Sequence, residues 1–264
     1  MKTKICLATA IFCIITLSTL AQNKAYLVLE YMHVKAGNEE AYMKTEALWR
    51  KIHLQRLKDS TILDWGVWSV TLPYNMNAEY QYVVATVYPS IDAYINSYAK
   101  VDIHKVFPGV SDDSINNMFS KTGESRDLLR SAVFEIVFSE GLEKHVPNYV
   151  LASQMKATPG KESEYETLET KDWRTIHKDL IKNGFESGFN FSRLLFPADA
   201  NGPYNYAIFR FFDKPSMLDK IDNANWNKYM QANPGAFSNA GKLRTEVHTE
   251  LLTKVVSLEE EPKM

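Results

Sequence analysis

Two tryptophan and histidine pairs are the residues of this sequence whose types and spacing best suit chemistry. Trp49 and His53 stand four positions apart, and Trp173 and His177 repeat this spacing in the pattern Trp-Arg-x-Ile-His. Side chains at i and i+4 of a helix lie on one face, so each indole can stack on its imidazole. Such a histidine could ligate a metal or haem iron, or act as a general base. The same residues could instead anchor a core, and their presence in both places favours packing over a site.

Two arginines interrupt aromatic and aliphatic stretches in the second half of the chain. Arg193 follows Phe189 and Phe191 at alternate positions, and Arg210 stands where the first half has Thr86. On adjacent strands of one sheet, two arginines could hold a carboxylate or polarise a bound oxygen species.

A buried arginine is more often half of an ion pair, and glutamates on other predicted strands offer partners. The candidate partners are Glu30, Glu135 and Glu250. We take His53, His177 and Arg210 as candidate catalytic residues. The candidate ligand-binding residues are Trp49, His53, Trp173, His177, Arg193, Tyr206 and Arg210.

Four further basic residues precede or open predicted strands, where exposed salt bridges are expected. They are Arg126 and Arg130, with Arg244 and His248 as their counterparts. The sequence contains no Gly-rich phosphate loop, no Gly-x-Ser-x-Gly elbow and no His-Glu-x-x-His motif. These absences argue against nucleotide binding, α/β-hydrolase chemistry and a zinc protease site, and no metal site is predicted.

One sequence unit occurs twice in the chain. Residues 26–42 and 149–165 match at Tyr, Met, Gly, Glu and Tyr with an offset of 123. The first Trp-Arg-x-Ile-His segment begins seven residues after Tyr42, whereas the second begins eight residues after Tyr165. Further matches follow in the same order, which indicates an internal duplication.

Each copy predicts the element order βαββαβ. Apolar and β-branched runs predict the strands, and capping signals open the helices. In the first copy the predicted strands are 26–34, 65–72, 80–88 and 131–138, and the helices are 39–57 and 90–100. In the second copy the strands are 149–157, 189–196, 204–212 and 248–256, and the helices are 161–181 and 216–222.

The third strand of each copy is apolar on both faces, unlike a strand with one face in water. The order βαββαβ gives a ferredoxin-like sheet with helices on one face, so the other face needs a second cover. We predict an α+β protein in which two ferredoxin-like sheets pack face to face as an eight-stranded barrel, with the helices outside. The predicted divisions are a first repeat over 23–138, a linker over 139–148, a second repeat over 149–256 and an acidic tail over 257–264.

This arrangement resembles a tandem, single-chain version of the dimeric α+β barrel superfamily. That superfamily includes proteins similar to antibiotic-biosynthesis monooxygenases, haem-degrading monooxygenases and chlorite dismutases. The repeated Trp-Arg-x-Ile-His helix is similar to that of exported proteins of Bacteroidetes. The resemblance rests on topology, and fold does not fix function.

The resemblance to chlorite dismutases implies a haem alternative. In that branch the second half of a tandem unit holds the haem, which would make His177 the iron ligand, with Arg193 or Arg210 on the opposite side. His53 stands at the equivalent position of the half that should lack haem, which argues against this alternative. The haem-degrading branch fits less well, because its first-strand Asn and third-strand Trp have no match here.

Residues 1–22 have the features of a secretory signal peptide. Lys2 and Lys4 precede an apolar run of at most 16 residues, shorter than the ~20 residues that span a bilayer. Both cysteines, Cys6 and Cys13, lie in this segment, so the mature chain would contain no disulfide or thiolate. We expect a periplasmic or secreted protein with no membrane association after cleavage.

Composition leaves three kinds of function open. With 30 basic against 32 acidic side chains and no Lys/Arg cluster, a nucleic-acid partner is not expected. The 14 Tyr, 13 Phe and five Trp favour a pocket between sheet and helices for a small aromatic or apolar molecule, with or without cofactor-free oxygenase-like chemistry. The alternatives are a haem protein and a scaffold without enzymatic activity, and the oligomeric state stays open.

Overall fold

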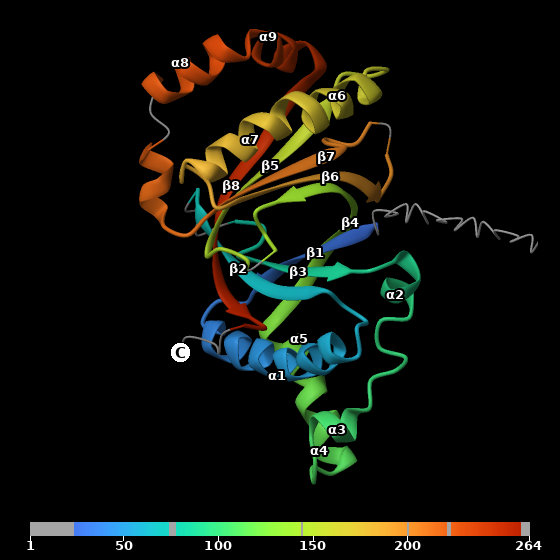
Figure 1. Ribbon diagram of the computed structural model, residues 1–264. Helices are drawn as coiled ribbons and strands as arrows, with labels where there is room; N and C mark the ends of the chain where they lie inside the picture. The colour runs from blue at the N-terminus through green and yellow to red at the C-terminus, as the bar shows by residue number, and fades with distance from the viewer. Residues whose placement is uncertain (1–23, 74–77, 144, 200, 221–222, 260–264) are drawn as a thin grey trace, which may run out of the picture.

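The structure is a computed structural model that describes residues 24–73, 78–143, 145–199, 201–220 and 223–259 (Figure 1). The predicted signal peptide and the end of the acidic tail lie outside the described residues. No helix among the described residues has the length and apolar character needed to cross a bilayer.

The described residues of the first half form four strands, with one long helix after the first strand and four short helices before the last. Its elements are β1 (Ala25–Val34), α1 (Glu39–Lys58), β2 (Asp64–Leu72), β3 (Tyr82–Tyr88), α2 (Ile91–Ile95), α3 (Ile103–Val106), α4 (Asp112–Ser120), α5 (Thr122–Ser125) and β4 (Arg126–Glu140).

The second half repeats this order with a different set of helices before its last strand. Its elements are β5 (Tyr149–Ala157), α6 (Glu162–Leu168), the π-helix η1 (Glu169–Trp173), α7 (Arg174–Lys182), β6 (Gly188–Phe196), β7 (Tyr206–Phe212), the 3-10 helix η2 (Pro215–Lys220), α8 (Asn223–Ala232), α9 (Pro234–Leu243) and β8 (Arg244–Ser257).

The eight strands form a closed barrel in the order β1-β3-β2-β8-β5-β7-β6-β4, and every neighbouring pair is antiparallel. Two seams join the halves: β2 pairs with β8, and β4 pairs with β6. The predicted fold class is therefore confirmed. The two sheets enclose a shared interior, and their edges are hydrogen-bonded to each other at both seams.

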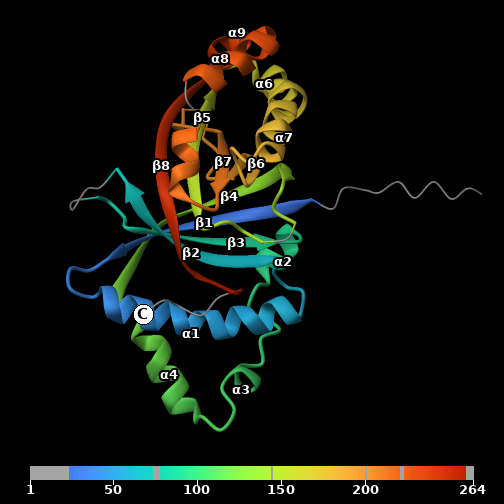
Figure 2. The ribbon, with the colours of Figure 1, turned by 60° about the vertical axis from the view of Figure 1, so that its left-hand side comes forward.

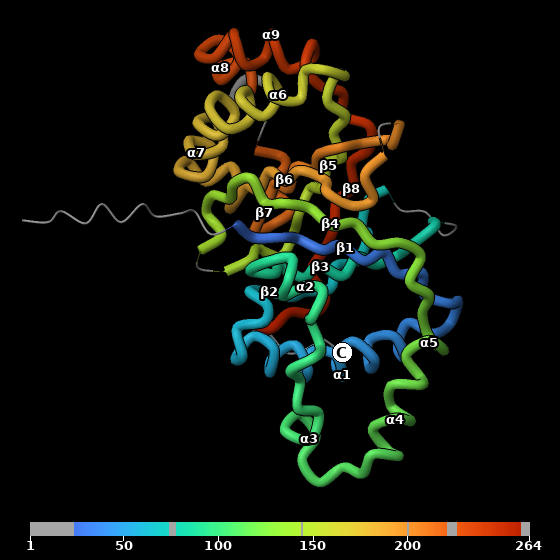
Figure 3. Tube along the Cα trace, turned by 90° about the vertical axis from the view of Figure 1, so that its right-hand side faces the viewer, coloured from blue at the N-terminus to red at the C-terminus, as the bar shows by residue number. Residues whose placement is uncertain are grey.

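The helices cover the outside of the barrel in two layers. Figures 1 and 2 show α1 lying across the strands of the first half, and α6 and α7 lying across those of the second. Figure 3 shows α3 and α4 beyond α1, and α8 and α9 beyond α6 and α7. Strand β3 shows why both faces of the sheet must be covered. Val83 packs inside the barrel, in the cluster of buried side chains that we call the lumen cluster. Its neighbour Val84 packs on the outer face of the sheet, in a second cluster beneath the helices.

The second helix of each copy differs from the prediction. The predicted helix 90–100 begins at Ser90, whose hydroxyl accepts a hydrogen bond from the Ala93 N–H, but it ends at Ile95. The Asn96 side chain donates a hydrogen bond to the Asp92 carbonyl oxygen. Such a local bond between side chain and backbone competes with the continuation of the helix. The predicted helix 216–222 is the 3-10 helix η2 as far as Lys220, residues 221 and 222 lie outside the described residues, and α8 and α9 follow.

The π-helix η1 explains the unequal spacing of the two copies. Seven residues turn an α-helix by 700°, about 20° short of two full turns, so Tyr42 and Trp49 share a face. Eight residues would overshoot by about 80°. The extra residue of the second copy is absorbed in the wider turn of η1, which returns Trp173 to the face of Tyr165.

The described residues of the connection between the halves, 141–143 and 145–148, fold against the end of the barrel. Leu142 and Val146 pack on the lumen cluster. A Cβ on Gly188 would collide with the Leu142 side chain, so this close approach requires glycine. The predicted linker began at 139, whereas β4 continues to Glu140.

Candidate functional site

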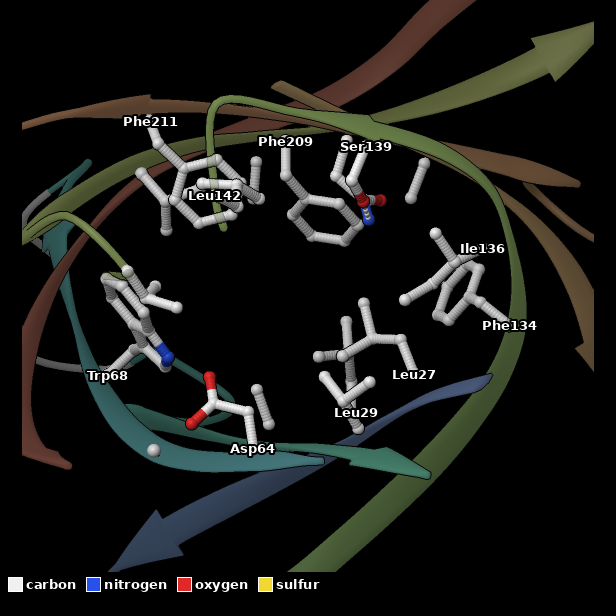
Figure 4. A pocket seen from close by; sticks show the side chains of 18 of the residues that line it. Leu27, Leu29, Asp64, Trp68, Phe134, Ile136, Ser139, Leu142, Phe209 and Phe211 are labelled. Atoms are coloured by element: carbon white, nitrogen blue, oxygen red, sulfur yellow. Dashed lines mark hydrogen bonds between the residues drawn. The ribbon is translucent and has the colours of Figure 1, made fainter. Parts of the chain in front are cut away.

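A cavity of about 720 Å³ occupies the barrel interior (Figure 4). Strands of both halves contribute its walls, which are mainly aliphatic and aromatic. Among the lining residues are Leu27, Leu29, Trp68, Phe134, Ile136, Leu142, Phe209 and Phe211. We expected the pocket between a sheet and its helices. The cavity lies instead between the two sheets, because large buried aromatic side chains fill the layers beneath the helices.

Small residues explain why the barrel interior is not filled. An eight-stranded barrel is just wide enough to be packed solid by large side chains. Here four inward-facing positions on four different strands carry little or no side chain. These positions are Gly66, Ala85, Ala152 and Ala207.

Strand β2 places two polar groups on one wall of the cavity. Figure 4 shows the Asp64 carboxyl group and the Trp68 indole pointing into the cavity. Burial raises the pKa of Asp64 to about 6; Glu259 adds to this, whereas the Trp65 backbone N–H and Lys254 oppose it. No side chain among the described residues hydrogen-bonds or ion-pairs with Asp64.

Ser139 and Asn190 line the opposite wall of the cavity, where Figure 4 shows the Ser139 side chain. The Asn190 amide donates to the Ser139 hydroxyl at 2.9 Å, and the Ser192 hydroxyl donates to the Asn190 carbonyl oxygen at 2.6 Å. Each of these three residues therefore has a hydrogen-bond partner within the group, whereas Asp64 has no side-chain partner among the described residues.

Of the predicted ligand-binding residues, Arg193 is the one that lines this cavity. Its guanidinium lies 2.6 Å from the Glu135 carboxylate and 2.8 Å from that of Glu166. The ion pair with Glu135 was one of those predicted. Lys24 also contacts Glu135, at 2.7 Å.

The predicted residue His53 belongs to α1, and its ring points toward the outer face of the first sheet. Its ring stacks on Trp65 with 4.7 Å between centroids, and its Nδ1 is 2.9 Å from an Arg56 guanidinium nitrogen. Burial lowers the pKa of His53 well below its usual range, and Arg56 adds to this. Trp49 packs beside it, with 6.1 Å between the two rings.

The equivalent residue His177 belongs to α7, and its side chain points toward the second sheet, where it is part of a buried chain of charges. Its ring stacks on Phe189 at 3.6 Å, and its Nδ1 is 2.7 Å from the Glu186 carboxylate. The other oxygen of Glu186 accepts a 2.7 Å hydrogen bond from Arg210. Burial lowers the pKa of His177 despite Glu186. The pKa of Glu186 is lowered too, because His177 and Arg210 outweigh the effect of burial.

The remaining predicted residues also lie in the outer layer of the second half. Trp173 packs near His177, and the Tyr206 hydroxyl donates to the Glu166 carboxylate at 2.9 Å. Arg210 has its ion-pair partner in Glu186 rather than in any of the three predicted glutamates. The structure therefore assembles His177, Arg210 and Trp173 in one layer and separates them from the cavity.

The layer beneath α7 does not fit a haem ligated by His177. Phe189 stacks directly on the imidazole, and the side chains around it are tightly buried. Phe191, Tyr165 and Tyr206 are at most 2% exposed. A porphyrin beside His177 would have to displace this aromatic layer, so we derive no chemistry through haem. Among the described residues, no cluster of three or more His, Cys, Asp or Glu could hold a metal ion.

Sequence reasoning missed a pair of buried carboxylates. Glu46 ion-pairs with Arg126, and Glu169 lies 3.2 Å from Arg244. We expected exposed salt bridges for these arginines, but both glutamates are fully buried beneath the long helices. Burial raises the pKa of each glutamate to about 7, and its arginine opposes the shift. A repeated Glu four residues after the matched tyrosine was the available signal.

Solved structures with the same fold confirm the architecture. A monooxygenase-like protein from Lactobacillus acidophilus aligns with a TM-score of 0.55 at 7% identity, over 89% of this chain and 95% of its own. Another, from Fusobacterium nucleatum, aligns with a TM-score of 0.55 at 11% identity, over 91% and 94%. An anthrone oxidase-like protein aligns with a TM-score of 0.50 at 9% identity, over 90% and 95%.

These similarities show the fold of a dimeric α+β barrel, with both halves present as tandem repeats in one chain. At such low identity they establish the fold and not the activity. No protein-family model matches this sequence, and no curated protein is significantly similar to it.

Proposed function

We propose that the barrel interior binds a small organic molecule with a largely apolar or aromatic body. The observation that carries this proposal is the cavity of about 720 Å³ between the two sheets. Its walls are apolar except for a few polar groups at defined places, which is the usual composition of a small-molecule site.

The packing of the outer layers supports the same location. His53, His177 and Arg210 are engaged with buried neighbours, and His177 is covered by an aromatic ring. The lumen, by contrast, offers apolar surface that no side chain in the described part of the chain covers. Filling it with a ligand would remove that surface from water, worth roughly 25 cal/mol per Å².

Titration with a neutral fluorescent probe, N-phenyl-1-naphthylamine, tests this function. We expect its emission to rise on binding to the wild type and to stay low with Ala85→Phe, which fills the lumen. Ala41→Phe makes the same substitution on an exposed face of α1 and serves as the control. Mass spectrometry of the denatured protein would show whether it carries a molecule from its host. Failure of the wild type to bind the probe, with no molecule released, would contradict the proposal and favour a scaffold.

We also propose that the protein is exported. The support is the signal-like sequence of residues 1–22 and the confinement of both cysteines to it. Expression of the full chain in a Gram-negative host should give a periplasmic or secreted product whose N-terminus begins at Gln22 or Asn23. An uncleaved product in the cytoplasm would contradict export.

A further inference from the structure

Strand β2 gives the cavity a distinct recognition element. Asp64, Gly66 and Trp68 stand at alternate positions and share the inward face of the strand. Because Gly66 has no side chain, nothing separates the carboxyl group from the indole along this wall. A Cβ at Gly66 would lie 3.5 Å from the Trp68 Nε1 atom and 3.3 Å from the Val256 carbonyl oxygen. The strand therefore places an acceptor, the Asp64 carboxyl group, and a donor, the Trp68 indole N–H, on the two sides of Gly66.

Asp64 stands out because the other acidic groups near the cavity are already engaged or exposed. Glu135 is paired with Lys24 and Arg193, and Glu250 contacts His248 at 3.0 Å and accepts from the Tyr80 hydroxyl. Glu143 and Glu259 are exposed. Among the described residues Asp64 has no side-chain partner, and a half-buried carboxylate on an apolar wall is costly without one.

The charge of the cavity lining has a negative excess. Five carboxyl side chains and three lysine or arginine side chains belong to it. Lys254, the cation that acts on Asp64, also donates its ammonium hydrogen to the Val146 carbonyl oxygen. Glu259 is the other charged group that acts on Asp64, and it adds negative charge. An anionic ligand would be disfavoured here, whereas a cation would compensate this excess.

We infer that the ligand carries a basic nitrogen, and that its ammonium group is bound by the Asp64 carboxylate beside Trp68. This inference rests on the proposed function and names the class of molecule: an aromatic or apolar amine. The apolar body would lie against Phe209, Phe211 and the aliphatic side chains of β1 (Figure 4).

Three compounds that differ only in their end group test the inference: 4-phenylbutylamine, 4-phenylbutan-1-ol and 4-phenylbutyrate. Their affinities can be measured by displacement of N-phenyl-1-naphthylamine. We expect the wild type to prefer the amine over the alcohol by about tenfold or more, as for a hydrogen bond to a charged group, and to bind the acid most weakly. The preference should increase between pH 5 and pH 7 as the Asp64 carboxyl group, whose pKa is about 6, loses its proton.

Asp64→Asn keeps the shape of the side chain and removes its charge. It should lose most of the preference for the amine, measured as the ratio of the amine affinity to the alcohol affinity within the same variant. Asp172→Asn makes the same change at an exposed position on η1 and should keep the preference.

The two proposals fail in distinguishable ways. Probe binding with equal affinities for amine and alcohol, or a preference that survives in Asp64→Asn, would overturn the inference and leave the cavity function standing. A preference that is lost only in Glu250→Gln would move the amine site to the other end of the cavity and would also overturn it. Absence of probe binding to the wild type would contradict the proposed function itself.

Discussion

The buried arginines of the outer layers have different kinds of partner in the two halves. Arg56 is fully buried beneath α1, where its guanidinium contacts His53 and the Tyr88 hydroxyl and lies 4.4 Å from the centre of the Tyr98 ring. Among the described residues no carboxylate lies within ion-pair distance of it. In the second half the cation comes from strand β7 instead, and Arg210 is paired with Glu186.

This difference predicts unequal costs of removing the two charges. Arg210→Met leaves the Glu186 carboxylate buried with less compensation, and such a change costs about 3–5 kcal/mol. Arg56→Met breaks no direct ion pair with a buried carboxylate, so the loss of stability should be smaller. Guanidinium unfolding followed by circular dichroism measures both. An equal or larger loss in Arg56→Met would show that Arg56 neutralises a carboxylate after all.

The raised pKa of Glu169 predicts a pH dependence of stability. Its pKa is about 7 in the folded protein, against an ordinary value of 4.5. As the pH rises, the Glu169 carboxyl group loses its proton in the unfolded chain before it does so in the folded protein. The contribution of protonated Glu169 to the free energy of unfolding is therefore fully present below pH 4.5 and is lost as the pH rises through about 7. The difference in unfolding free energy between wild type and Glu169→Gln should fall over that range.

Other titrating groups are common to both proteins and cancel in this comparison. Asp172→Asn, at an exposed carboxylate, should show no such trend. A wild-type minus Glu169→Gln difference that rises with pH would mean that Arg244 outweighs burial in fixing the protonation of Glu169.

At the scale of elements, the first three strands of each copy follow the sequence prediction closely. β5 coincides with its predicted range, and β1 and β2 each begin one residue early. The last strands are longer than predicted. The opening residues of β4 pair only with β1 and are largely exposed, so they lack the apolar pattern that marks a strand.

The helices before the last strands were the main omission. α8 and α9 are held by packing of Trp226 and Phe237 on Trp173, which no local pattern reveals. The π-helix was visible only as one extra residue between matched positions. Its cause is the need to keep two sets of buried side chains on one face.

Deletion of Lys171 tests this account of η1. The segment would then have the spacing of α1 and could continue as an α-helix, so the melting temperature should be unchanged or higher. Deletion of Lys44 in α1 is the control, because it rotates Trp49 and His53 by about 100° relative to Tyr42 and should strongly destabilise the protein. Comparable losses in the two deletions would show that η1 is needed for more than register.

At the scale of the whole molecule, each half depends on the other for its second cover. The seam between β4 and β6 uses Val133 to Glu140, and the seam between β2 and β8 is its pseudo-symmetric counterpart. A half by itself would expose its side chains of the lumen cluster to water.

We therefore expect residues 23–143, expressed alone, to form a homodimer in which β2 of each copy pairs with β4 of the other. Light scattering coupled to size exclusion would show twice the mass of the piece. A shorter piece ending at Ala132 lacks the seam residues of β4 and should not dimerise. A stable folded monomer of the longer piece would contradict the dependence of one half on the other.

The sequence by itself determined the duplication, the order of the strands, the two-sided burial of β3 and β7, and hence the barrel. These features depend on local periodicity and on the comparison of one copy with the other. Only the tertiary structure decided where the open space lies and which polar group faces it. Lumen width depends on residues such as Gly66 and Ala207, brought together from different strands, and alternation cannot tell which face of a doubly buried strand points inward. For that reason the conspicuous histidines proved to be packed beneath helices, whereas Asp64, unremarked in the sequence, faces the cavity.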